Sequence, residues 1–182
     1  MELKSTLITQ KQSIGLSIAE FLLMFLLGAM AIVLHARLRI PLHLPGRHGI
    51  EFMMLLLIGR NVTHFRFSGL YASLGIASML FVPVLGFKDP FMMVVFILPG
   101  IAIDVFYNAF PKINKNIWML ALASGIAYAL IPVSRMIISM FTGFMYESLL
   151  TGLMYPLFTH FSFGFIGGMG GTALVKAFRK KK

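Results

Sequence analysis

The sequence predicts an all-α integral membrane protein, a compact bundle of six transmembrane helices that form one domain over residues 1–182. Of the 182 residues, 58% are hydrophobic and only 12% are charged, whereas soluble domains carry roughly 25% charged residues. The mean hydropathy is +0.87. A helix of about 20 apolar residues crosses a hydrocarbon core of about 30 Å, so the chain length accommodates six spans and short connections.

Each predicted span ends where Pro, Gly or polar residues interrupt an apolar run. These interruptions lie at residues 41–46, 60–66, 86–90 and 111–115. Pro and Gly disfavour continued helix, and the polar run 60–66 predicts a tight turn. The predicted spans cover residues 15–36, 49–64, 67–86, 90–109, 116–140 and 147–175.

The basic residues predict a multi-pass protein of the cell (plasma) membrane with both termini in the cytoplasm. In that orientation the inner loops and termini carry Lys4, Lys11, Arg60, Arg66, Lys112, Lys115, Lys176, Arg179 and Lys180 to Lys182. The outer loops carry only Arg37, Arg39, Arg47 and Lys88, as the positive-inside rule requires. Because the basic residues are scattered, the net charge of +10 indicates contacts with anionic membrane lipids and no nucleic-acid surface.

In this orientation a group of polar residues gathers toward the outer ends of the spans. A charge inside a bilayer costs at least about 2.5 kcal/mol, so such residues usually face a cavity or one another. Convergent polar groups between apolar walls are typical of a pocket for a small polar molecule. The predicted substrate-binding residues are Arg47, His48, Glu51, Arg135, Tyr146, Glu147, Tyr155 and His160.

Other roles remain open for several of these residues. Arg135 either binds a ligand anion or forms a structural pair with Glu51 or Glu147. Arg47 and His48 could face lipid headgroups, and Glu147 could begin a helix, where a carboxylate is favourable. Asp104, in the inner half of the fourth span, is expected to pair with Arg60 or to bond with Asn108.

The sequence predicts no cofactor, no metal site and no catalytic residue. Cysteine is absent, and the histidines lack the spacing that a zinc protease needs. The glycines from 164 to 171 are not followed by the Gly-Lys-Ser/Thr ending of a phosphate loop. We therefore expect a protein that is not an enzyme, and any ATP-driven work requires a partner.

Small residues recur at four-residue spacing in three spans. Such stripes let helix backbones approach closely in lipid, either within this bundle or against another membrane protein. The stripes are Gly69, Ser73 and Ala77; Ala121, Gly125 and Ala129; Gly164 and Gly168; and Gly167 and Gly171.

The layout resembles the substrate-binding membrane subunits, or S components, of energy-coupling factor (ECF) transporters. The first span ends in Arg39-Ile40-Pro41-Leu42, and an outer linker, Leu44-Pro45-Gly46-Arg47-His48-Gly49, leads directly into a short second span. The last helix is glycine-rich from Gly164 to Gly171 and a basic tail follows it. The resemblance covers essentially the whole chain.

This resemblance implies capture of a vitamin-like organic molecule from outside the cell. It also implies two kinds of partner: a transmembrane coupling protein and cytoplasmic ATPases. Family members dock the coupling protein through small residues of the first helix, for which this chain offers Gly15, Ala19, Gly28 and Ala29. The metal-transporting members use an N-terminal histidine, which Met1-Glu2-Leu3-Lys4 lacks.

Two other classes of function remain as alternatives. The chain could be a structural or scaffold subunit of a membrane complex, in which the outer polar residues are ordinary loop residues. It could also be a membrane-embedded enzyme that modifies lipids, with His48, Glu51 or His160 as acid and base.

Overall fold

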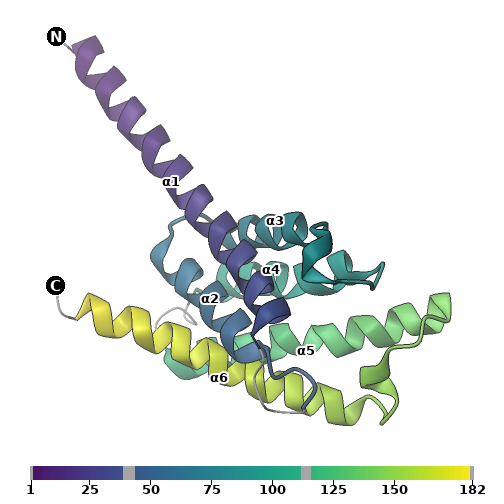
Figure 1. The fold of residues 1–182 in the computed structure, drawn as a ribbon. Helices are drawn as coiled ribbons and strands as arrows, with labels where there is room; N and C mark the ends of the chain where they lie inside the picture. Colours follow the sequence, from purple (N-terminus) through teal and green to yellow (C-terminus); the bar gives the residue numbers. More distant parts are fainter. Residues whose placement is uncertain (1, 39–43, 112–115, 181–182) are drawn as a thin grey trace.

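The computed structural model describes residues 2–38, 44–111 and 116–180, with side chains described from Ser17 onward. Over these residues the protein is all-helical (Figure 1). The α-helices are α1 (Glu2–Arg37), α2 (Gly49–Val62), α3 (Ser68–Leu80), α4 (Met92–Ala109), α5 (Ile117–Thr142) and α6 (Met154–Arg179). Two short 3-10 helices, η1 (Pro83–Leu85) and η3 (Glu147–Leu149), lie in the connections.

Four of the helical segments are long and apolar enough to cross a membrane. They are Ser17–Arg37, Met92–Ala109, Ile117–Thr142 and Met154–Arg179. The protein is therefore membrane-embedded. Helices α2 and α3 have 14 and 13 residues, so each rises only about 20 Å along its axis at 1.5 Å per residue.

The helices pack in a chain of neighbours around one apolar core. Helix α6 packs on α5 and on α2, and α3 packs on α1 and on α4 (Figure 1). Phe52 of α2, Phe96 of α4 and Tyr128 of α5 are almost completely buried in this core. The N-terminal part of α1 extends away from the other helices (Figure 1).

The glycines of α6 pack against two different helices of this chain. A Cβ at Gly164 or Gly168 would collide with Tyr128 or Ser124 of α5. A Cβ at Gly167 or Gly171 would collide with the backbone of α2. These stripes therefore serve packing within the bundle, one of the two roles that the sequence allowed.

Two predicted spans extend too far at one end. The span expected over residues 67–86 ends as α3 at Leu80, and Pro83 then begins η1. The span expected over residues 147–175 begins as α6 only at Met154, after η3 and after Gly152, whose φ is 87°. Both differences arise because apolar connections resemble helix in composition.

The two ends of the bundle carry different polar groups. The end where α1, α3 and α5 finish and α2, α4 and α6 begin holds His48 and is called the His48 end below. The opposite end holds Asp104 of α4 and is called the Asp104 end. Six membrane crossings and cytoplasmic termini remain predictions.

Candidate functional site

A tight turn positions the first residues of the site at the His48 end. Gly46 has a φ of 77°, in the left-handed region that favours glycine, and its carbonyl accepts the Gly49 N–H at 2.8 Å. A side chain at Gly46 would also overlap the His160 ring. The turn therefore leads directly into α2 and lies against α6.

Two histidine rings meet where α1 ends and α2 begins. The ring centroids of His35 and His48 are 4.5 Å apart, and the His35 ring also contacts Phe96 edge-on at 4.9 Å. His48 Nδ1 lies 2.5 Å from Glu51 Oε1, one turn further along the chain. Glu51 itself is only 6% exposed, so this carboxylate is held inside the protein.

His160 of α6 completes the inner side of the same cluster. Its ring stacks on Tyr128 with centroids 5.3 Å apart. Its Nδ1 lies 2.7 Å from the Pro156 carbonyl oxygen, which can only accept a hydrogen bond. Nδ1 therefore carries a hydrogen and donates it to this carbonyl.

Arg135 of α5 contacts residues of the segment between α5 and α6. Its guanidinium lies 5.4 Å from the centroid of the Tyr146 ring, and Nη1 donates a long hydrogen bond of 3.4 Å to Ser148 Oγ. The Tyr146 hydroxyl donates to Asp89 Oδ1 at 3.4 Å. Burial and the nearby Asp89 carboxylate raise the pKa of Tyr146 to about 12, so this phenol keeps its proton.

Three buried polar atoms of this region lack a hydrogen-bond partner among the described residues. They are His35 Nδ1, Glu51 Oε2 and Arg135 Nε. They come from three helices, α1, α2 and α5. A buried polar atom left without a partner costs about 1–3 kcal/mol, so their gathering at one end requires water or a ligand to supply hydrogen bonds.

A cavity of about 510 Å³ opens at this end, and of these three residues Arg135 is the one that lines it. Its walls are formed by Arg135 of α5, by the connection between α3 and α4, and by the connection between α5 and α6. Its lining residues include Phe87, Asp89, Arg135, Tyr146, Glu147 and Ser148. The Phe87 ring lies 6.3 Å from the His35 ring, so it separates the cavity from the histidine pair, which does not itself line it.

The structure brings most of the predicted binding residues together. His48 and Glu51 are bonded, and Arg47, Arg135 and His160 are close enough to His35 to act on it electrostatically. Other members of the predicted set lie as follows: Tyr146 is buried and lines the cavity, Glu147 is exposed at its rim, and Tyr155 is 45% exposed outside it.

One detail of the predicted site is corrected. Tyr146 and Glu147 were expected inside the sixth span, but both lie in the connection before α6. Glu147 begins the 3-10 helix η3, which resembles the helix-start role considered for it. Arg135 forms no ion pair with Glu51 or Glu147 in the ranges that the structure describes.

The sequence did not single out four residues that complete the site. His35, Asp89, Tyr128 and Ser148 all contact predicted members. For His35 a signal existed, because it is an ionisable residue in the last turn of an apolar helix. The others resemble ordinary core or loop residues until the helices are arranged in space.

The predicted docking residues of α1 are placed differently from one another. Gly15 lies outside the residues whose side-chain surroundings are described, and Ala19 is exposed. Gly28 is buried against the backbone of Ala72, and Ala29 lies beside Gly75, both in α3 of the same chain. That these residues bind a partner protein stays a prediction. Ala19 fits it better than Gly28, because Ala19 is exposed and Gly28 is buried.

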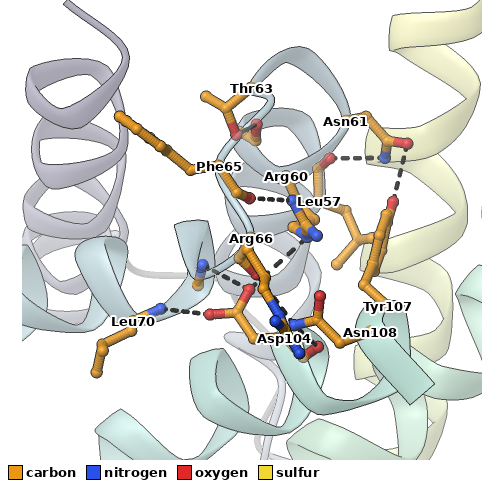
Figure 2. A network of polar contacts seen from close by, with 12 residues as sticks. Leu57, Arg60, Asn61, Thr63, Phe65, Arg66, Leu70, Asp104, Tyr107 and Asn108 are labelled. Carbon is orange, nitrogen blue, oxygen red and sulfur yellow. Dashed lines mark hydrogen bonds and ion pairs between the residues drawn. The ribbon is translucent and has the colours of Figure 1, made fainter. Parts of the chain in front are cut away.

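The Asp104 end holds a second polar cluster whose members bond to one another. Figure 2 shows the Asp104 carboxylate pointing at the start of α3, where it accepts the N–H groups of Gly69 and Leu70 at 2.9 and 2.8 Å. Arg60 Nε lies 3.7 Å from Asp104 Oδ1, and Arg60 Nη1 donates to the Phe65 carbonyl at 2.7 Å. The pairing of Asp104 with Arg60 confirms an expectation from the sequence.

Further bonds extend this second cluster to α6. The Tyr107 ring faces the Arg60 guanidinium at 4.2 Å, and its hydroxyl donates to Asn61 Oδ1 at 3.0 Å (Figure 2). Arg179 Nη2 donates to the Asn61 carbonyl at 2.5 Å. Most polar groups of this cluster are paired, which favours a structural role, although Arg60 Nε and Ser68 Oγ at this end also lack a hydrogen-bond partner among the described residues.

The His48 end brings together several groups that can form hydrogen bonds or stack on a ring. Its groups include a guanidinium, a carboxylate, imidazoles and aromatic rings. No group of three or more His, Asp or Glu residues that could hold a metal ion occurs in the described part of the chain. Comparisons with protein families, with curated proteins and with solved structures gave no match for this chain.

Proposed function

We propose that this protein is the substrate-binding membrane subunit of an ECF-type transporter and captures a vitamin-like organic molecule at the His48 end. The observations that carry this proposal are the unpartnered buried atoms His35 Nδ1, Glu51 Oε2 and Arg135 Nε at this end and a cavity of about 510 Å³ that Arg135 lines. Hydrogen bonds from a bound molecule would offset the cost of burying these atoms.

The composition of the cavity wall supports a small organic ligand. Phe87 and Tyr146 offer aromatic surface, while Arg135 and Ser148 offer hydrogen-bond donors. Lys88, Asp89 and Glu147 add charges of both signs, so this wall is more polar than that of a usual small-molecule site and favours a polar ligand.

The proposal includes the orientation of the chain in the plasma membrane. The His48 end would face outward and the Asp104 end, with Arg60, Arg66 and Arg179, would face the cytoplasm in agreement with the positive-inside rule. Both termini would then be cytoplasmic after six crossings. The coupling protein and the ATPases would meet the chain from the membrane and from the cytoplasm.

Mass spectrometry of small molecules released from gently purified protein tests the proposal. We expect a compound other than lipid in roughly one-to-one ratio with the wild-type protein. Arg135→Ala should retain at most about a tenth of it, because a hydrogen bond to a charged group contributes about 1.5–3 kcal/mol.

Arg66→Ala is the matched control, since Arg66 is an exposed arginine at the Asp104 end. It should retain the compound at the wild-type level, and all three proteins should be recovered in similar yield. Release of lipid alone from the wild type would contradict the proposed function. Equal loss of yield and of ligand in Arg135→Ala would assign Arg135 to structure.

A further inference from the structure

Arg135 is a guanidinium to which no carboxylate of the described residues is bonded. Its contacts are the Ser148 hydroxyl and the face of the Tyr146 ring. Within the described ranges it forms no ion pair with any carboxylate. Its Nε is buried and has no hydrogen-bond partner there.

The carboxylates nearest to Arg135 are engaged elsewhere or exposed. Asp89 accepts the Phe91 N–H at 2.9 Å and the Tyr146 hydroxyl, and Glu51 is bonded to His48. Glu147 is exposed at the rim of the cavity. No carboxylate of the described residues therefore bonds directly to the Arg135 guanidinium, which lines the cavity together with Lys88, Asp89 and Glu147.

The chemistry of the opposite partner follows from this arrangement. A planar guanidinium with free N–H groups prefers a carboxylate or a phosphate, which can accept two parallel hydrogen bonds. The rings of Phe87 and Tyr146 line the same cavity and offer faces to a flat molecule. A cationic ligand would instead be repelled by Arg135.

We infer that the ligand of this cavity is an organic acid whose oxyanion binds the Arg135 guanidinium and whose flat apolar part packs between Phe87 and Tyr146. This inference rests on the proposed function and specifies its substrate class. The negative group enters from the cavity side, where Nη1 of Arg135 already reaches Ser148. Glu147 at the rim disfavours acids that carry a second negative group.

A lipid phosphate is another source of an oxyanion near a membrane surface. A phospholipid presents its phosphate with two acyl chains, whereas the cavity beside Arg135 has aromatic walls and a volume of about 510 Å³. We therefore commit to a soluble acid. Measurements with the protein in nanodiscs of phosphatidylcholine alone and of phosphatidylcholine with phosphatidylglycerol separate the two sources.

The test compares acids with their neutral amides on the full-length protein. The probes are benzoate, 2-naphthoate and indole-3-acetate, each paired with its primary amide, and binding is measured by isothermal titration calorimetry. We expect at least one acid to bind roughly tenfold more tightly than its amide, as the loss of one charge-assisted hydrogen bond predicts. In Arg135→Gln this ratio should fall to about one.

Two further variants keep the result interpretable. Arg135→Lys retains the charge and should keep part of the preference for acids, and Arg66→Gln should keep all of it. Equal affinity for acids and amides in the wild type, or no binding by any probe, overturns the inference. So does loss of acid binding when phosphatidylglycerol is present, which would assign Arg135 to lipid.

Failure of this inference is distinguishable from failure of the proposed function. If a neutral or cationic compound is released in stoichiometric amount from the purified protein, the transport proposal stands while the acid inference fails. If no compound other than lipid is released and no probe binds, both fail.

Discussion

A single carboxylate at the Asp104 end serves three partners. Asp104 accepts two N–H groups from the first turn of α3 and lies beside Arg60. The first N–H groups of a helix have no partner inside that helix, and a negative charge is favourable there. Asp104 therefore caps α3 from a different helix while neutralising a buried guanidinium.

Asp104→Ala should destabilise the protein strongly. It leaves Arg60 buried without its counter-charge, and breaking a buried ion pair in this way costs about 3–5 kcal/mol. Asp104→Asn should lose less, because one amide oxygen still accepts an N–H of Gly69 or Leu70. The measurement is thermal unfolding in detergent.

Glu147→Gln provides the control for this pair, since Glu147 is exposed and takes no part in the Asp104 cluster. Its unfolding temperature should match that of the wild type. An Asp104→Ala protein as stable as Glu147→Gln would contradict the structural role assigned to Asp104.

The site shows how far residue types alone can lead. Arg135 and Glu51 were predicted because a charge within an apolar run demands an explanation, and the structure places both at one end, with Glu51 buried and Arg135 half-buried. Tyr128 has the sequence context of a core aromatic and is indeed buried, yet it also stacks on His160. Its second role depends on the position of α6, which residue types do not encode.

At the scale of helices, α6 depends on glycine along two adjacent faces. Gly167 and Gly171 lie against the backbone of α2, whereas Gly164 and Gly168 lie against α5. Between them, a Cβ at Gly170 would meet nothing closer than the sulfur of Met54, at 3.9 Å. Neighbouring glycines of one helix thus differ in what a side chain would meet.

This difference provides a matched pair of substitutions. Gly171→Ala places a methyl group against the Met54 backbone and should lower the free energy of unfolding by about 1–3 kcal/mol, the usual cost of overpacking. Gly170→Ala should leave it unchanged or raise it slightly, because alanine favours helix over glycine. Thermal unfolding of both variants in the same detergent measures the contrast, and equal unfolding temperatures would refute the packing described for α6.

The sequence predicted which segments form helices better than it predicted where those helices end. The apolar runs indicated six helices in the correct order, because each must satisfy its backbone hydrogen bonds internally. The end of α3 and the start of α6 were misplaced, because residues such as Phe81 and Leu150 are apolar yet lie in connections. Hydropathy measures contact with lipid and carries little information about where a helix stops.

For the whole molecule, the separation of polar groups into two ends agrees with helices that run alternately up and down. At the Asp104 end the backbone N–H of His64 donates to the Glu20 carboxylate of α1, and the Asn108 side-chain amide donates to the Arg66 carbonyl. At the other end Arg37 donates to the Val84 carbonyl at 2.9 Å. Each of these contacts joins segments on the same side of the bundle.

Cysteine labelling tests the orientation, because the natural chain has no cysteine and gives no background. We expect a membrane-impermeant maleimide to label Glu147→Cys in intact cells, since Glu147 is exposed at the His48 end. Arg66→Cys, exposed at the Asp104 end, should react only after the membrane is opened. The reverse pattern would place both termini outside.

The capping of α3 by Asp104 has a consequence for how the chain enters the bilayer. The carboxylate belongs to a residue 35 positions after Gly69, so the ribosome completes α3 well before its cap exists. A helix of 13 residues is also too short to settle alone in a hydrocarbon layer of about 30 Å. Helices α3 and α4 should therefore leave the insertion machinery together as a hairpin.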